Sequence, residues 1–231
     1  VSLDGYKNGD FAMTMGNTGS TSRYLSSDVI KEMRDAINKP RNEVRGIRQE
    51  EMIHHRRCDE SVRITYDSNS SKSSNKWKNA IGMNKCIDSV GILAMKRQLE
   101  DKVRAYQEST VFLNGKLDFD KMRDLYQQRY GLISVMTYFK ETMVRGSELT
   151  SRAITYALGR PGKGPEGTKK KQDVQLEDNS NTWDAATGKE ILVALLRNYR
   201  QCVDKKWVPD FYNTIDKKFG GDYAAYVNAV F

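Results

Sequence analysis

Proline, cysteine and histidine are scarce in this sequence, and long hydrophobic runs are missing. The three cysteines, Cys58, Cys86 and Cys202, are widely separated and odd in number, which argues against a disulfide framework or a zinc knuckle. The longest apolar run, residues 191–196, is far shorter than the about 20 residues of a transmembrane helix, so we expect no membrane span. The sequence begins with valine and shows no basic segment followed by an apolar one. We therefore expect a piece of a longer protein, without a signal peptide in these residues.

The residues needed for a self-contained hydrolase are also scarce. There is no Gly-x-Ser-x-Gly motif, and the only histidines are the adjacent His54 and His55. Neighbouring side chains on a helix point about 100° apart, so the two histidines cannot serve one nucleophile. His54 and Cys58 are four residues apart, but two ligands are too few for a metal site. We expect no complete Ser-His-Asp set, no metal and no other cofactor, and we interpret His55 and Cys58 as lining a half-buried helix edge.

The charge pattern argues against a nucleic-acid partner, although the formal net charge is +8. Lysine and arginine alternate with aspartate and glutamate along most of the chain, as on ordinary solvated helix faces. The one concentrated basic run, Lys169–Lys171, lies in a Gly/Pro-rich segment. A basic helical module that binds an acidic partner or nucleic acid remains the alternative function, and a purely structural spacer is a second one.

Apolar residues recur at helical spacing along most of the sequence, which predicts an all-α, bundle-like domain of about seven to nine helices. One stripe is especially regular: Ile92, Met95, Leu99, Val103 and Tyr106. A second one, in the helix expected near Trp183, consists of Ile191, Leu192, Leu195, Leu196, Tyr199 and Val203.

Local signals predict where these helices begin and end. Ser26 or Ser27 is the expected N-cap of a helix that Pro40 stops, and a long helix is expected from Arg41 to about Tyr66. Asp118 caps a later helical run, in which Gly131 and Gly146 are places to bend or break. From about residue 159 to 181 the pattern stops, and the glycines and prolines there predict a mobile loop. Pro209 is expected in the first turn of a short helix closed by Gly220, and Asp222 is expected to cap the last helix.

Residues Phe11–Met15 predict a short buried strand, which is out of place at the head of a helical chain. A lone strand cannot satisfy its own backbone groups, so its partners would belong to a neighbouring β domain. Two alternatives are that the segment pairs with a second copy of the chain or that it is disordered. The turn that follows contains Gly16, Gly19 and Ser20. It lacks the Gly-Lys-Ser/Thr ending of a phosphate-binding loop, so we interpret it as a tight turn.

The segment Trp77–Asn84 carries residues that are poor choices for a helix interior, namely Asn79, Gly82 and Asn84. Gly82 would permit close approach of another backbone, and Asn79 would present an amide to a cleft. An equally good interpretation is a helix near its end, with Asn79 on a solvent face.

These motifs resemble those of the bacterial serine dipeptidyl-peptidases of the chymotrypsin clan, the dipeptidyl-peptidases seven and eleven. The turn from Gly16 to Tyr24 resembles the family signature Gly-Tyr-Pro-Gly-x-Thr-x-Arg-Tyr, although Asn17-Thr18 stands where the family usually has Tyr-Pro. Trp77–Met83 is similar to the family element Trp-Lys-Asn-x-Ile-Gly-Met. The end of the chain, from Leu195 to Phe231, is similar to the end of the family's helical region.

The resemblance implies that residues 1–24 are the terminal strand and turn of a catalytic β-barrel and that residues 25–231 are a helical capping domain. By this resemblance, the helical domain closes over the active-site cleft of an exopeptidase that releases dipeptides. The helical domain is inactive when isolated, and the catalytic triad lies outside this chain. Asn79 is then the candidate anchor for the substrate's N-terminal amine, and Gly16, Gly19 and Ser20 are the candidate hinge. The implied partners are the peptide N-terminus and the barrel of the same parent chain, which is expected to be periplasmic or at the cell surface and to allow a homodimer.

Overall fold

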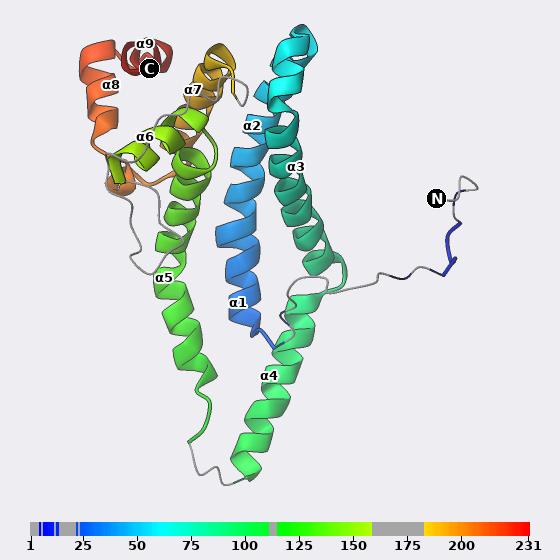
Figure 1. Ribbon diagram of the computed structural model, residues 1–231. Helices are drawn as coiled ribbons and strands as arrows, with labels where there is room; N and C mark the ends of the chain where they lie inside the picture. Colours follow the sequence, from blue (N-terminus) through cyan, green and yellow to red (C-terminus); the bar gives the residue numbers. More distant parts are fainter. Residues whose placement is uncertain are drawn as a thin grey trace, which may run out of the picture.

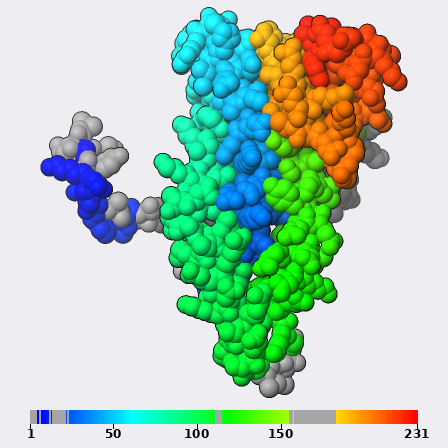
Figure 2. Space-filling view, turned by 180° about the vertical axis from the view of Figure 1, so that it is seen from behind, coloured from blue at the N-terminus to red at the C-terminus, as the bar shows by residue number. Residues whose placement is uncertain are grey.

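The computed structural model describes residues 5, 7–11, 13, 22, 24–110, 115–158 and 183–231. These residues form nine α-helices and three short π or 3-10 segments, which confirms the predicted all-α class. Figure 1 shows the long helices standing side by side, with α2 between α3 and α5. From behind, Figure 2 shows that α4 and the beginning of α5 form a tapered lower end, while α7 to α9 lie at the upper end.

The first helical stretch does not stop at Pro40, contrary to the sequence prediction. Helix α1 (Ser27–Glu32), the π-helical η1 (Met33–Asn38) and α2 (Lys39–Cys58) follow one another without interruption. A proline inside an α-helix lacks an N–H and clashes with the carbonyl four residues earlier. The wider π turns immediately before Pro40 change that local geometry, so the chain stays helical. The predicted cap is confirmed, since the Val29 amide donates to Ser26 Oγ at 3.4 Å.

The helix predicted from Arg41 to Tyr66 is two helices, because α2 ends at Cys58 and α3 (Glu60–Ser89) begins two residues later. Asp59 separates them with an extended backbone, and its carboxylate accepts from the amides of Ser61 and Val62. The hydrophobic stripe did not reveal this break because Val62 packs against the same core as Val44 of α2. After the turn, α3 runs back beside α2 (Figure 1).

The next helices are α4 (Ile92–Ser109), α5 (Phe119–Phe139) with the π turn η2 (Lys140–Val144), and α6 (Glu148–Leu158). Asp118 caps α5 as predicted, since its carboxylate accepts from the Lys121 amide at 2.9 Å. The chain breaks at Gly146, as predicted, but α5 runs through Gly131. A Cβ at Gly146 would lie 2.3 Å from the Glu141 carbonyl oxygen, so only glycine fits this tight break without a shift.

The C-terminal part consists of α7 (Ala185–Cys202), the 3-10 turn η5 (Lys205–Trp207), α8 (Phe211–Phe219) and α9 (Tyr223–Val230). Asp184 caps α7 and Asp222 caps α9, and Gly220 ends α8 with a φ of 60°, so the expected Asp222 and Gly220 signals are confirmed. Pro209 lies two residues before α8 rather than in its first turn. Helix α7 supplies the centre of the core, because its predicted stripe is nearly inaccessible: Ile191, Leu192, Leu195, Leu196, Tyr199 and Val203.

Several sequence predictions fall wholly or partly outside the described residues. No described residue is in a strand; Phe11 and Met13 are described without regular structure, and the other three residues of the predicted strand lie outside the description. Gly16, Gly19 and Ser20 lie outside it, and so does the expected loop at about 159–181. Among the described helices, none is both long and apolar enough to cross a membrane.

A polar cluster around Glu43 joins α2, α5 and α7. The Glu43 carboxylate accepts hydrogen bonds from Tyr138 Oη at 2.7 Å, Asn198 Nδ2 at 2.8 Å and Cys202 Sγ at 2.9 Å. Burial alone would raise the pKa of Glu43, but these three donors outweigh it and lower that pKa below its usual range. Burial and the Glu43 carboxylate raise the pKa of the Cys202 thiol to about 11.

We expect Cys202 to be the slowest of the three cysteines to react with iodoacetamide at pH 8. All three are exposed, but a thiol with a pKa of about 11 is ionised in roughly one molecule in a thousand at that pH, and only the thiolate reacts. Peptide mapping by mass spectrometry measures the three rates. In the Glu43→Gln variant the Cys202 rate should rise while those of Cys58 and Cys86 stay the same. An equal Cys202 rate in both proteins would contradict the assigned role of Glu43.

Candidate functional site

Trp77 holds the middle of α3 against α2. Its indole Nε1 donates to the Asn42 carbonyl oxygen at 3.0 Å. Beside this bond the indole ring lies against Gly46, where an added Cβ would sit 3.7 Å from the ring nitrogen. The tryptophan therefore fixes which face of α3 turns toward α2 and which turns away.

Asn79 lies on the face of α3 that turns away from α2. It follows Trp77 by two residues, which is about 200° around the helix, and its side chain is exposed. Asn79 has no hydrogen bond to another residue within the described part of the chain. Its amide oxygen and nitrogen are therefore open to solvent or to a ligand, as are those of the exposed Asn75 on the same helix. This exposure fits the predicted binding group and the predicted solvent face equally.

The two other unusual residues of this segment have different explanations. Asn84 is structural, because its Nδ2 donates to the Arg34 carbonyl at 3.0 Å and its Oδ1 accepts from Asn38 Nδ2 at 2.9 Å. These bonds tie α3 to the π turn before Pro40. Apart from its chain neighbours and the backbone of its own helix, no described atom would lie within 4 Å of a Cβ at Gly82. The expected close approach of a backbone to Gly82 is therefore not made by these helices.

Replacing Trp77 by phenylalanine is expected to loosen the attachment of α3 to α2, and so to affect Asn79 only by changing how firmly its helix is held. The change keeps most of the ring packing but removes the indole donor, which leaves the Asn42 carbonyl short of one partner and costs about 1 kcal/mol. Hydrogen exchange of the α3 amides should become faster by roughly fivefold. The Phe119→Leu variant, a change on α5, is a control that should leave the α3 amides unaffected. Unchanged exchange in Trp77→Phe would show that the indole bond does not hold α3.

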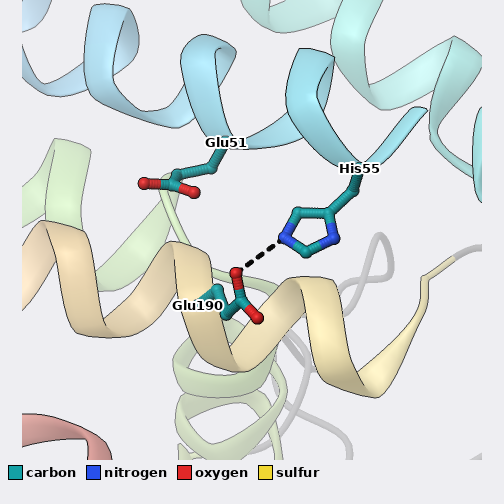
Figure 3. Close-up of side chains that lie close together, drawn as sticks. All are labelled: Glu51, His55 and Glu190. Atoms are coloured by element: carbon teal, nitrogen blue, oxygen red, sulfur yellow. Dashed lines mark hydrogen bonds and ion pairs between the residues drawn. The ribbon is translucent and has the colours of Figure 1, made fainter. Parts of the chain in front are cut away.

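A cluster of possible metal ligands joins α2 to α7 (Figure 3). The ligand atoms of Glu51, His55 and Glu190 all lie within 4.8 Å of one another, and His55 Nε2 is 2.9 Å from Glu190 Oε2. Glu51 and His55 are four residues apart and so share one face of α2. One histidine and two carboxylates are donors that suit a divalent first-row metal ion with an open coordination position. The hydrogen bond between His55 and Glu190, however, already satisfies these two side chains without a metal ion.

The structure separates the sequence-predicted candidates. His55 is half-buried at the helix edge, as expected. The same expectation is wrong for Cys58, which is exposed at the last residue of α2, and His54 is exposed too. Glu51 and Glu190 were missed by the sequence analysis, because Glu190 reaches the cluster from a helix 135 residues away from His55. The sequence analysis singled out Asn79 because an asparagine inside a helix is unfavourable, and its role in binding stays a prediction.

The described residues form an all-α domain whose long helix α3 exposes the Asn79 side chain. The chain belongs to the peptidase S46 family, whose model matches residues 1–231. It is 33% identical to dipeptidyl-peptidase 7 of Phocaeicola vulgatus over 99% of this chain and 33% of that protein. It is 35% identical to dipeptidyl-peptidase 7 of Porphyromonas gingivalis over 100% of this chain and 32% of that protein.

A solved structure has the same fold. The crystal structure of Porphyromonas endodontalis DPP11 in complex with the dipeptide Arg-Glu superposes with a TM-score of 0.71 and 20% sequence identity. The match covers 91% of this chain and 31% of that chain. The chain thus spans about a third of the length of the curated relatives it matches, and the predicted resemblance to the helical domain of a dipeptidyl-peptidase is confirmed.

Proposed function

We propose that residues 25–231 are the helical cap of a serine exopeptidase that releases dipeptides from the N-terminus of peptides. Residues 1–24 would supply the last strand and turn of the catalytic β-barrel, and the Ser-His-Asp triad would lie outside this chain. Membership of the S46 family and the names of the relatives support the peptidase assignment. The observation that carries the cap role is the exposure of large apolar side chains on α4 and on α5 within the described residues.

We refer to the exposed hydrophobic side chains of α4 and of α5 together as the apolar face. The regular stripe of α4 was expected to pack, yet Met95 is 59% exposed, Leu99 53% and Tyr106 61%. Helix α5, the next along the chain, exposes Leu125 and Leu132, and α4 and the beginning of α5 form the tapered lower end in Figure 2. Exposed apolar patches rimmed by polar residues mark interaction sites. About two thirds of the relatives' length has no counterpart in this chain, and we infer that the catalytic barrel of the parent protein covers the face.

Asn79 would anchor the substrate by its N-terminal amine. An exopeptidase must recognise the α-ammonium group to set its register, and an uncharged amide oxygen is a suitable acceptor for that cation. The exposed and unpaired side chain of Asn79 supports this role. Closing the cap would exclude water from the cleft and strengthen the electrostatic contacts to the bound amine. Gly16, Gly19 and Ser20 would form the hinge.

Two measurements test the cap. The purified 231-residue chain alone should release no dipeptides, whereas the full-length parent should. Structures of the full-length protein, free and with a bound dipeptide, should differ in the position of the helical domain relative to the barrel. Dipeptide release by the chain alone would contradict the proposal, and so would identical cap positions in the two structures. The periplasmic or cell-surface location and the homodimeric parent stay predictions.

A further inference from the structure

A cationic cavity of about 450 Å³ lies between α2, α3 and the beginning of α6. Helix α2 contributes two arginines, α3 two lysines and the α6 region two further arginines. These six cations are Arg45, Arg48, Lys72, Lys76, Arg145 and Arg152. The cavity is separate from the Glu51–His55–Glu190 cluster, and none of its lining residues belongs to the proposed amine anchor.

The two arginines of α2 are buried, so part of the cavity lining consists of buried charged side chains and not only of surface lysines. Arg45 is 7% exposed and Arg48 is 6% exposed. Arg45 Nε donates to Glu141 Oε2 at 2.7 Å, and Arg48 forms an ion pair with Glu148. Keeping a guanidinium this deeply buried is costly unless negative charge surrounds it.

Among the described residues, the cations that line the cavity outnumber the carboxylates that pair with them. Among the described residues, Glu141 pairs with Arg45 and Glu148 pairs with Arg48, and Glu141 also accepts from Arg41 at 3.1 Å. Arg152 lies over the Trp183 ring and is left out of the charge count. Among the described residues, the other five lining cations face two carboxylates, which leaves an excess of three positive charges. Burial lowers the pKa of Arg45, and the charges of Arg48 and Arg41 lower it further against the opposing effect of Glu141.

A second observation points to a ligand in the cavity. The Nε atom of buried Arg48 has no hydrogen-bond partner within the described residues, and neither has the Oε2 atom of Glu148, its ion-pair partner in the same cavity. The cavity is also lined by Ser147, Glu148 and Ser151, which form the N-terminal turn of the eleven-residue helix α6. Unpaired amides and the helix dipole make such a turn favourable for an anion.

We propose that this cavity binds a polyvalent oxyanion, carrying phosphate or carboxylate groups. Guanidinium groups match planar or tetrahedral oxyanions with paired N–H donors, and the exposed lysines add point charges at the mouth. A single monovalent anion would leave most of the excess charge uncompensated, which favours a ligand with two or more charges. A phosphate compound and an acidic peptide share this chemistry.

Calorimetric titration of the full-length protein at low ionic strength tests the proposal with two probes, pyrophosphate and N-acetylated triglutamate. The acetyl group prevents the peptide from using the amine anchor. We expect one-to-one binding of at least one probe with a Kd below about 1 mM. Binding of pyrophosphate alone identifies a phosphate site, and binding of the peptide alone identifies a carboxylate site.

The Lys72→Ala/Lys76→Ala variant should weaken this binding by about tenfold or more, because it removes two exposed charges at the mouth without touching the core. The matched control is Lys85→Ala/Lys102→Ala, which removes two exposed lysines outside the cavity and should bind as the wild type does. The proposal is overturned if neither probe binds the wild-type protein, or if the two variants weaken binding equally.

Discussion

Replacing Asn79 by alanine in the full-length protein is expected to lower kcat/KM for dipeptide release by about 10- to 100-fold. A hydrogen bond to a charged group contributes about 1.5 to 3 kcal/mol, and each 1.4 kcal/mol is a factor of ten. Alanine removes the acceptor for the substrate's ammonium group without disturbing a contact among the described residues, because the Asn79 side chain is exposed and has no partner there. Release of a chromophore from dipeptide substrates measures the effect.

Two comparisons separate an anchor from a structural role. Asn79→Asp keeps an oxygen acceptor and should retain far more activity than Asn79→Ala. Asn213→Ala, a change of an exposed asparagine on α8, should leave the kinetics unchanged. Wild-type kinetics in Asn79→Ala would remove the assignment while leaving the cap proposal in place, since the cap rests on the uncovered apolar face.

Replacing Glu141 by glutamine is expected to lower the free energy of local unfolding of α2 by about 3 to 5 kcal/mol. The Glu141 carboxylate is 1% exposed and accepts from Arg45 at 2.7 Å, Arg41 at 3.1 Å and Arg145 at 3.3 Å. The glutamine amide has nearly the same shape but no charge, so three guanidinium groups, one of them buried, would lose their shared counter-ion. Breaking a buried ion pair from one side is costly for this reason.

Hydrogen exchange of the α2 amides in the full-length protein measures the free energy of opening. The matched control is Glu108→Gln, which changes an exposed glutamate of α4 and should alter it by less than about 0.5 kcal/mol. Equal exchange rates for Glu141→Gln and the wild type would show that the arginines find other partners, and would weaken the case for a cavity short of negative charge.

The sequence predicted the α-helical class and much of the core because these depend on local spacing. The stripe from Ile191 to Val203 packs as its periodicity indicated. Side-chain caps such as Asp118 and Asp222 were found because each acts on amides two or three residues away. The predictions failed where a local signal was overruled, as at Pro40, where the preceding π turns change the helix geometry.

The sequence also singled out Asn79, but it could not decide between a cleft and a bare solvent face. The structure shows that Trp77 fixes the rotation of α3 by bonding to Asn42, 35 residues earlier. The exposure of Met95 and Leu99 could not be predicted from the spacing of apolar residues either. That spacing shows which residues share a helix face, but not whether another part of the protein covers the face.

By itself, then, the sequence determined which segments are helical, where four of them are capped and which family's motifs they carry. Only the tertiary structure decided which helix faces are covered and which distant charges meet. Arg45 and Glu141 are 96 residues apart, and their contact exists because α2 packs beside the end of α5. Helix propensity and capping act over a few residues, whereas burial and charge pairing depend on how whole helices pack, which no local pattern contains.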